Sequence, residues 1–426
     1  MLARRYDPRR DEFGTDVEIG ERSSMRWSWQ VAFLLAILCV GAGCLSARRY
    51  PPPDLPPSAR LIPADGPKKD VPAEVIPASH APAPRTVLAI SGGGLCGAYT
   101  VGVLKGWSDA GTRPKFDVVT GISTGGLIAP LAFLGAESDD LLEEWYTSTR
   151  PGDIYRRRSL PTLLWSDSLA DSTPLRRRIE TVVTPEFLSR IAAEHTAGRR
   201  LYVGTTDLDS KRLVVWDLGA IAASDDPGKL ELFRNVLLAS CAVPGLLSPV
   251  AIDVEVNGQR RTELHVDGGV SAQAFVPPQA LRDTSAANSP GMSVFVIVSG
   301  KVVPHWRPVP LRLIDVSEES LNGLLRAQIR GDLQRISLQA KMAGAGFGFT
   351  AVPDEFAAGE AAQIGPQLLR RLFSEGYHFG RSGTHWRRAL SGLDADDEPP
   401  PRTGIRFNVN EERPPRGAIN QPSPNK

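Results

Sequence analysis

Short apolar runs alternate with helical spacing at the start of the folded part of the chain. Residues 86–90 and 116–120 are short apolar runs, as expected for strands that are covered on both faces of a sheet. Each run is followed by glycines and then by a segment with helical spacing, at 98–107 and at 125–134. Strand, glycine turn and helix thus occur twice, which predicts a doubly wound α/β core.

The later pattern combines hairpins, a further strand and longer helices. Paired apolar runs that flank turn residues such as Asn257-Gly258 predict β-hairpins. These hairpins are expected at 201–206 with 212–216 and at 250–256 with 262–266. The other expected elements are a buried strand at 292–298 and helices at 230–239, 317–342 and 366–375.

An uncharged stretch at 27–47 stands between arginines and predicts an export or membrane signal. Its unbroken apolar core, 31–43, is shorter than the roughly 20 residues of a membrane-spanning helix and suits a signal peptide. Small residues lead into Cys44, as in a bacterial lipoprotein signal, although Gly41 stands where such signals usually have a larger aliphatic residue. We expect cleavage before Cys44 with lipidation; an uncleaved anchor in the membrane is the alternative.

Polar and proline-rich segments flank this signal. The segment after it contains eleven prolines between residues 51 and 84, which predicts an extended spacer. Met25 makes a more ordinary start for a signal than the polar residues before it. The expected organisation is a polar extension at 1–26, the signal at 27–47, the linker at 48–84, a catalytic domain at 85–393 and a polar tail at 394–426. We therefore expect the body to be exported and held at the cell envelope.

Composition limits the chemistry. The 426 residues carry a net charge of +1, which gives no reason to expect a nucleic-acid partner. The four cysteines show no paired spacing and have no nearby histidines, so neither a metal site nor a disulfide scaffold is indicated. We expect neither a metal nor a cofactor.

A serine lies between a predicted strand and a predicted helix. Gly121-Ile-Ser123-Thr-Gly125 follows the strand at 116–120 directly. A serine hydroxyl needs a neighbouring base and an exposed position on a sharp turn to act as a nucleophile, and small flanking residues allow such a turn. The position of Ser123 therefore favours a catalytic nucleophile over an ordinary turn residue.

A glycine run and an acidic turn supply two further candidate groups. The run Gly92-Gly93-Gly94 with Gly97 can present backbone N–H groups either to a phosphate or to an oxyanion. It is neither GxGxxG nor a Walker sequence, so the oxyanion role is favoured. Asp267 ends a predicted strand before Gly268 and Gly269; it is either a turn-closing residue or a base for Ser123.

These motifs, in this order, resemble the patatin-like phospholipases, here of a bacterial lipoprotein type. The resemblance covers about residues 85–300 and includes a fourth stretch, Ala239-Ser-Cys-Ala-Val-Pro244. It implies a three-layer α/β/α fold with a mostly parallel central sheet, and a lipid acyl hydrolase acting on lipids or phospholipids. It also implies that Asp267 accepts the proton of Ser123, and that Gly92, Gly93, Gly94 and Gly97 form the oxyanion loop.

One position departs from the family pattern. The family commonly has Arg or Lys just before the last glycine of the oxyanion loop, and this chain has Cys96. A protein that keeps the fold but acts in binding or scaffolding is therefore an alternative. Cys241 lies in the fourth motif, and a disulfide between Cys96 and Cys241 is a second possibility beside two separate buried thiols.

A histidine-dependent α/β-hydrolase is the other alternative. His305, His378 and His385 follow Ser123, as the triad order of that fold requires, but surface or packing roles are favoured for all three. His265 shares a strand face with Asp267, and a structural, hydrogen-bonded role is favoured for it.

Two arginine triplets, 156–158 and 176–178, flank a stretch that contains Leu160, Leu163, Leu164 and Trp165. This arrangement suits an interfacial flap that meets lipid headgroups. Solvated loop arginines are the favoured interpretation.

Overall fold

The computed structural model describes residues 86–159, 166–256, 259–282, 291–303, 308–354, 356, 365–383 and 386–388. The chain divides into two compact units, one made of residues 1–76 with 158–169 and the other of residues 77–157 with 170–426. In the first unit the described part is a short loop, in which the Arg158 N–H donates to the Leu169 carbonyl at 3.0 Å. The predicted signal, Cys44, the linker and the tail lie outside the described residues.

The second unit is built on an eight-stranded sheet with the order β10-β9-β1-β2-β5-β8-β7, in which β6 also pairs with β5. The strands β10, β9, β1, β2 and β5 are parallel, and β6, β8 and β7 are joined by antiparallel pairs. Their bounds are β1 Thr86–Ile90, β2 Val118–Ile122, β5 Arg200–Asp207, β6 Arg212–Asp217, β7 Val250–Val256, β8 Gln259–Asp267, β9 Ser293–Val298 and β10 Gly346–Ala351. A separate two-stranded sheet joins β3 (Arg156–Arg157) to β4 (Ala170–Asp171).

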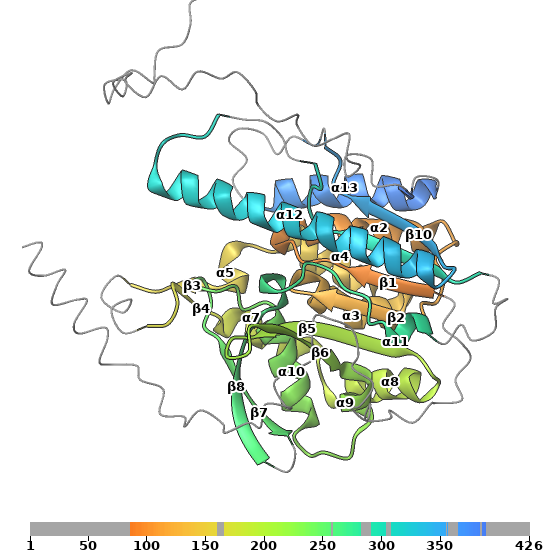
Figure 1. Cartoon of the computed structure of the whole chain (residues 1–426), viewed down its shortest axis with the longest axis horizontal. Helices are drawn as coiled ribbons and strands as arrows, with labels where there is room; N and C mark the ends of the chain where they lie inside the picture. Colours follow the sequence, from red (N-terminus) through yellow and green to blue (C-terminus); the bar gives the residue numbers. More distant parts are fainter. Residues whose placement is uncertain are drawn as a thin grey trace, which may run out of the picture. The chain divides into compact units, whose positions relative to one another are not determined.

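Helices cover both faces of the large sheet, which makes the second unit a three-layer α/β/α fold (Figure 1). Alternate residues of β1 enter different cores: Leu88 and Ile90 join one cluster, and Val87 and Ala89 join the other, as the period of two along a strand requires. Two helices cover one face, α11 Gln279–Arg282 and α12 Leu313–Met342. The helices toward the other face are α2 Gly97–Asp109, α3 Thr124–Leu134, α4 Asp139–Ser148, α7 Thr173–Val182, α8 Pro185–Thr196, α9 Leu218–Ala223, α10 Lys229–Ser240 and α13 Pro366–Ser382, with the short α5 Pro151–Ile154 before β3.

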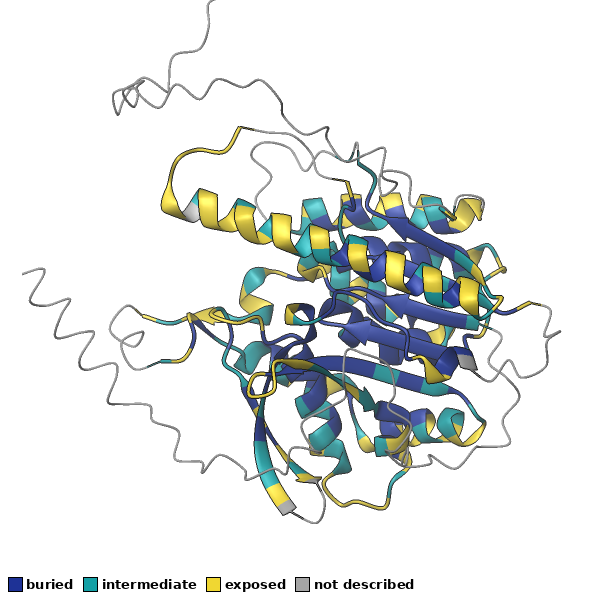
Figure 2. Cartoon of the chain, in the orientation of Figure 1, coloured by how far each residue is buried: buried dark blue, intermediate teal, exposed yellow. Residues whose placement is uncertain are grey.

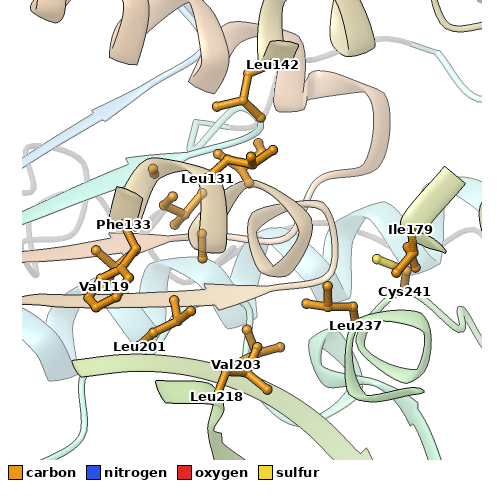
Figure 3. Close-up of a cluster of buried hydrophobic side chains, with 14 of the residues drawn as sticks. Val119, Leu131, Phe133, Leu142, Ile179, Leu201, Val203, Leu218, Leu237 and Cys241 are labelled. Atoms are coloured by element: carbon orange, nitrogen blue, oxygen red, sulfur yellow. The ribbon is translucent and has the colours of Figure 1, made fainter. Parts of the chain in front are cut away.

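The two buried clusters account for the layered arrangement. The larger one lies between the sheet and the helices on the side of α3 and α10, and Figure 3 shows Val119, Phe133 and Leu201 among its side chains. Apolar surface that leaves water on folding stabilises the protein by roughly 25 cal/mol per Å². Burial is concentrated in the strands and in the helix faces that meet them (Figure 2). Among the described residues, none of the helices combines the length and the apolar character needed to cross a bilayer.

Most of the predicted elements of the body are present, and their ends differ. The strand expected at 116–120 is β2, which begins two residues later at Val118, and the helix expected at 366–375 continues to Ser382 as α13. The expected helix at 317–342 begins earlier, at Leu313. The helices α4, α7 and α8 and the strand β10 were not expected from the sequence pattern.

The interpretation of the arginine triplets as solvated loops is wrong for two residues of α7. Arg176 pairs with Glu231 at 3.1 Å, and the guanidinium of Arg178 lies over the Trp145 ring at 4.7 Å from its centroid. Both arginines therefore hold α7 against other helices. The apolar stretch 160–165 lies outside the described residues.

Two strands meet end to end along one edge of β5. β2 pairs in parallel with the first part of β5 and ends with Ile122 opposite Gly204. β8 pairs antiparallel with the next part and ends with Asp267 opposite Thr205. Because β6 pairs with both parts of β5, it must occupy the other edge, and β2 and β8 share this one. The ends of β2 and β8 therefore face each other, which places Ser123 beside Asp267.

Glycines allow α2 and α13 to pack with their backbones in contact. A Cβ atom added at Gly376 of α13 would lie 2.0 Å from the Tyr99 carbonyl oxygen of α2, and one added at Gly102 of α2 would lie 2.1 Å from the Phe373 carbonyl oxygen. Such a methyl group has no room unless the helices separate, and overpacking typically costs 1–3 kcal/mol.

We therefore expect Gly376→Ala to lower the free energy of unfolding by about 2 kcal/mol, measured by urea denaturation. The matched control is Gly323→Ala on α12, where no atom lies within 4 Å of the added Cβ; there the higher helix propensity of alanine should stabilise by up to about 1 kcal/mol. Equal shifts for the two variants would contradict the packing explanation.

Candidate active site

Ser123 lies on a strained turn between β2 and α3. Its backbone has φ 53° and ψ −124°, a conformation that residues other than glycine rarely adopt. The turn is possible because its neighbours lack side chains. A Cβ atom at Gly121 would lie 2.2 Å from the Gly125 carbonyl oxygen, and one at Gly125 would lie 2.4 Å from the Ile90 carbonyl oxygen.

The structure brings Ser123 and Asp267 together. The Ser123 hydroxyl donates to Oδ2 of Asp267 at 2.6 Å, and Oδ1 of Asp267 accepts the Gly269 N–H at 2.7 Å. The two residues are only 9% and 5% exposed. Gly268 must be small here, because a Cβ atom would lie 2.5 Å from the Gly204 carbonyl oxygen. The carboxylate is therefore oriented by one backbone amide toward one hydroxyl.

Burial changes the acidity of the carboxyl group. Removal from water raises the pKa of Asp267 from 3.8 to about 6, and the hydrogen bonds from Ser123 and Gly269 oppose part of that rise. Desolvation disfavours the charged form of an acid. A carboxylate with this pKa is ionised at neutral pH and is a stronger proton acceptor than an ordinary aspartate.

Ser240, at the end of α10, holds the backbone of the turn. Its hydroxyl accepts the Ser123 N–H at 2.9 Å and donates to the Gly204 carbonyl at 2.8 Å, and the side chain is fully buried. One hydroxyl thus joins the turn, β5 and α10. The sequence pattern identified the fourth motif around Ser240, but its role as a backbone clamp depends on three elements that are distant in sequence.

The glycine run lies between β1 and α2. Gly93 has φ 155°, and a Cβ atom there would lie 1.6 Å from the Ser299 carbonyl oxygen, so no other residue fits. The Gly92 N–H donates to the Gln273 carbonyl at 3.0 Å, and the Gly97 N–H faces carbonyls of its own turn. Within the described part of the chain, the N–H groups of Gly93 and Gly94 donate to no other group.

Hydrogen bonds of buried hydroxyl groups hold the backbone of the glycine run in place. The Ser91 hydroxyl donates to the Gly92 carbonyl at 2.7 Å and accepts the Ser299 N–H at 2.9 Å. The hydroxyls of Thr100 and Ser299 are 2.7 Å apart. The loop amides are therefore preorganised, which is what the stabilisation of an oxyanion requires.

Gln273 and Asp332 connect the glycine run, the acidic turn and α12. The Gln273 side chain donates to the Gly269 carbonyl at 3.0 Å. The N–H groups of Gln273 and Ala274 donate to Oδ2 of Asp332 at 2.6 and 3.1 Å. Burial raises the pKa of Asp332, and these two N–H donors partly offset the rise. Neither Gln273 nor Asp332 was expected from a motif.

Cys96 and Cys241 are both free thiols, so the disulfide considered from the sequence is not formed. Burial raises the pKa of the Cys241 thiol, and the negative charge of Asp267 adds to that rise, whereas the Ser123 side chain opposes it. Burial also raises the pKa of Cys96, against the charge of Lys301. A raised pKa keeps both groups as neutral thiols.

The structure gives His265 a structural position. The ring is fully buried; its Nδ1 lies 2.9 Å from the Thr205 hydroxyl and its Nε2 lies 3.2 Å from Glu263. No described histidine hydrogen-bonds to Ser123. His378 is on α13 beside Tyr377, and His305 and His385 lie outside the described residues.

Across the described ranges, no group of three or more His, Cys, Asp or Glu side chains is arranged to hold a metal ion.

Three comparisons place the chain among known proteins. Residues 88–278 match the family model described as patatin-like phospholipase. A patatin-like phospholipase domain-containing protein of Meyerozyma guilliermondii is 32% identical over 175 residues, which are 39% of this chain and 23% of that relative. The crystal structure of VipD from Legionella pneumophila aligns with a TM-score of 0.37 and 10% identity, over 71% of this chain and 67% of that one. The match at residues 88–278 bears out the family resemblance expected from the motifs, and this range contains both Ser123 and Asp267.

Proposed function

We propose that this chain, in which residues 88–278 match the patatin-like phospholipases, is a serine acyl hydrolase that cleaves ester bonds of lipids, with phospholipids as the substrate class. The observation that carries the proposal is the 2.6 Å hydrogen bond from a strained, buried serine to a carboxylate with a raised pKa. Perturbed acids beside nucleophiles are typical of catalytic sites.

The proposed reaction consists of acylation and deacylation of Ser123, and Asp267 accepts and then returns a proton in each. Oδ2 of Asp267 takes the Ser123 proton while Oγ bonds to the ester carbonyl carbon, and the N–H groups of Gly93 and Gly94 stabilise the oxyanion. Collapse of this intermediate expels the alcohol, which takes the proton from Asp267. Water then attacks the acyl-enzyme and gives a proton to Asp267, and that proton returns to Ser123 as the carboxylic acid leaves.

Lys301 argues against the alternative, a scaffold protein with weak catalysis, because it supplies a positive charge that Cys96 does not. Although Cys96 replaces the basic residue common in the family, the charge of Lys301 acts on Cys96, and the glycine run packs against Ser299 just before it in sequence. Lys301 also donates to the Asp354 carbonyl at 2.8 Å, which holds its side chain in place. A positive charge near the oxyanion loop supports catalysis over binding alone.

Placement at a membrane completes the proposal. Lipidation at Cys44, or an uncleaved apolar segment at 27–47, would tether the body through the proline-rich linker at the cell envelope. A tethered hydrolase meets its lipid substrate without diffusion from solution.

The experiment that tests this function combines active-site labelling with a lipid panel. A fluorophosphonate probe should label the parent protein at Ser123, and a panel of phospholipids and neutral glycerides should release fatty acid. Absence of labelling and of fatty acid release from every lipid would favour the scaffold. Loss of turnover on replacing His305, His378 or His385 would instead favour a histidine-dependent esterase.

The rate should depend on the ionisation of Asp267. Because the base must be unprotonated, kcat/KM for a soluble ester should be constant above pH 7, fall to half near the pKa of about 6, and fall about tenfold per unit below it. Circular dichroism at each pH confirms that the fold persists. A rate that stays constant down to pH 5, or rises, would rule out Asp267 as the base.

A further inference from the structure

The helix α12 is longer than the sheet that it covers. Its 30 residues span about 45 Å at 1.5 Å per residue, whereas β9 and β10 have six residues each, or about 20 Å. β10 follows α12 closely in sequence and begins beside the start of β9, with Gly346 opposite Ser293. The end of α12 therefore lies at the amino edge of the parallel strands, and its beginning extends past the carboxyl edge, where Ser123 follows β2 (Figure 1).

Burial divides α12 into two halves. Ile329, Leu333, Ile336 and Ala340 in the second half are buried against the sheet. None of the described side chains from 313 to 328 is buried, and Figure 2 shows this half as largely exposed. We call residues 313–327 the overhang.

The overhang carries apolar side chains in water. Leu313 is 84% exposed, Leu321 52% and Leu324 69%. Isolated exposed leucines are common, but three of them on one half of a helix at the rim of a site indicate a contact surface.

The overhang ends where α12 contacts the residues that follow the acidic turn at Asp267. Gln328 makes hydrogen bonds with the Gln273 side chain at 3.3 Å and with the Val270 carbonyl at 3.5 Å. Leu324 and Leu321 precede Gln328 by four and seven residues, so they share its face of the helix. Val270, three residues after Asp267, is itself 50% exposed. An apolar surface therefore runs from the edge of the catalytic pair outward along the helix.

The charge of the overhang identifies the kind of partner. Within the overhang, Arg326 stands against Asp315, Glu318 and Glu319, so the segment has a net negative charge that repels anionic lipids and nucleic acids. An apolar surface that repels anionic lipids fits a zwitterionic bilayer, which offers buried hydrocarbon without a net charge.

We propose that Val270, Leu313, Leu321 and Leu324 form a docking surface for a zwitterionic lipid bilayer, which presents the acyl ester to Ser123. This inference rests on the proposed function, since it names the physical state in which that site meets its substrate. Docking at the overhang would let a lipid pass from the bilayer to the carboxyl edge of the sheet without crossing bulk water.

The test compares two double variants of α12. Leu321→Ser with Leu324→Ser changes the overhang. The control, Leu338→Ser with Met342→Ser, changes residues of at least similar exposure, 59% and 80%, on the half of α12 that covers the sheet. We expect the overhang variant to lose more than tenfold in hydrolysis of phosphatidylcholine vesicles while its rate on a soluble nitrophenyl ester stays within about twofold. The control variant should keep both rates. An unchanged vesicle rate, or equal losses on both substrates, would overturn the proposal.

A second measurement separates docking from catalysis. In the full-length Ser123→Ala protein, phosphatidylcholine vesicles should slow amide hydrogen exchange in residues 313–327 more than in residues 329–342. If the parent hydrolyses no ester but this protection occurs, the proposed function fails and the docking surface stands. If protection is absent, docking fails whatever the activity. A protein that is dimeric in the ultracentrifuge and becomes monomeric only with the overhang variant would identify a second copy as the occupant instead.

Discussion

Replacing Ser123 by alanine should lower kcat/KM for ester hydrolysis by at least about a thousandfold, because the variant has no oxygen to form the acyl-enzyme. Fluorophosphonate labelling should disappear at the same time. The effect should be confined to chemistry, since alanine carries a Cβ atom like serine and meets the same backbone strain at φ 53°, and the clamp from Ser240 to the backbone N–H does not use the lost hydroxyl.

The stability of Ser123→Ala provides the control. The carboxylate of Asp267 loses one donor but keeps the Gly269 N–H, so the free energy of unfolding should change by no more than about 1–2 kcal/mol. Esterase activity in the variant equal to that of the parent would show that Ser123 is not the nucleophile. A folded variant with no activity and no labelling is the expected result.

Replacing Asp267 by asparagine should lower kcat/KM on the order of a thousandfold or more, because an amide cannot accept the Ser123 proton. The geometry should persist, since the asparagine oxygen can still accept the Gly269 N–H at the position of Oδ1 and the amide nitrogen can face the Ser123 hydroxyl. Steady-state kinetics on a soluble ester measures the loss. An enzyme that keeps its rate with Asp267→Asn would require another base, and a histidine would be the first candidate.

The same variant should be more stable than the parent at pH 8. The native pKa of Asp267, raised from 3.8 to about 6, means that the folded state binds the proton more tightly than the unfolded chain does. Stability therefore falls as the pH rises from about 4 to about 6, and ionisation costs about 3 kcal/mol above that window. Asparagine carries no charge. The unfolding free energy of Asp267→Asn should therefore exceed that of the parent at pH 8, and this difference should vanish near pH 4. A loss of stability at pH 8 would contradict this account.

Opposite effects on activity and stability are expected of a catalytic group held in an unfavourable environment. Ser123 in a strained backbone region and Asp267 as a buried charge both reduce stability. Their hydrogen bond and the surrounding clamps offset part of that cost, which explains why the pair persists in a well-packed unit.

Much of the fold could be predicted from the sequence, because its signals are local. The period of apolar residues predicted β1, α2, α3, both hairpins and α12, and the glycines at 121 and 125 predicted the sharp turn around Ser123. The three-layer arrangement followed from the family resemblance. Helices such as α4 and α7 were missed because their short apolar stripes are interrupted by charged residues, among them Arg176 and Arg178, whose partners lie on other helices.

The sequence by itself determined the candidate nucleophile, the acidic turn and the glycine run, since each requires a particular residue type at one sharp turn of backbone. Only the tertiary structure decided how they act together. The end-to-end meeting of β2 and β8 along β5 puts Ser123 within hydrogen-bond distance of Asp267 across 144 residues of sequence. Packing around Gly92 directs its amide to Gln273, whereas the amides of Gly93 and Gly94 donate to no other group among the described residues, as the proposed oxyanion role requires. The raised pKa of Asp267 has the same origin, because burial depends on which distant elements fold over the carboxylate rather than on its neighbours in the chain.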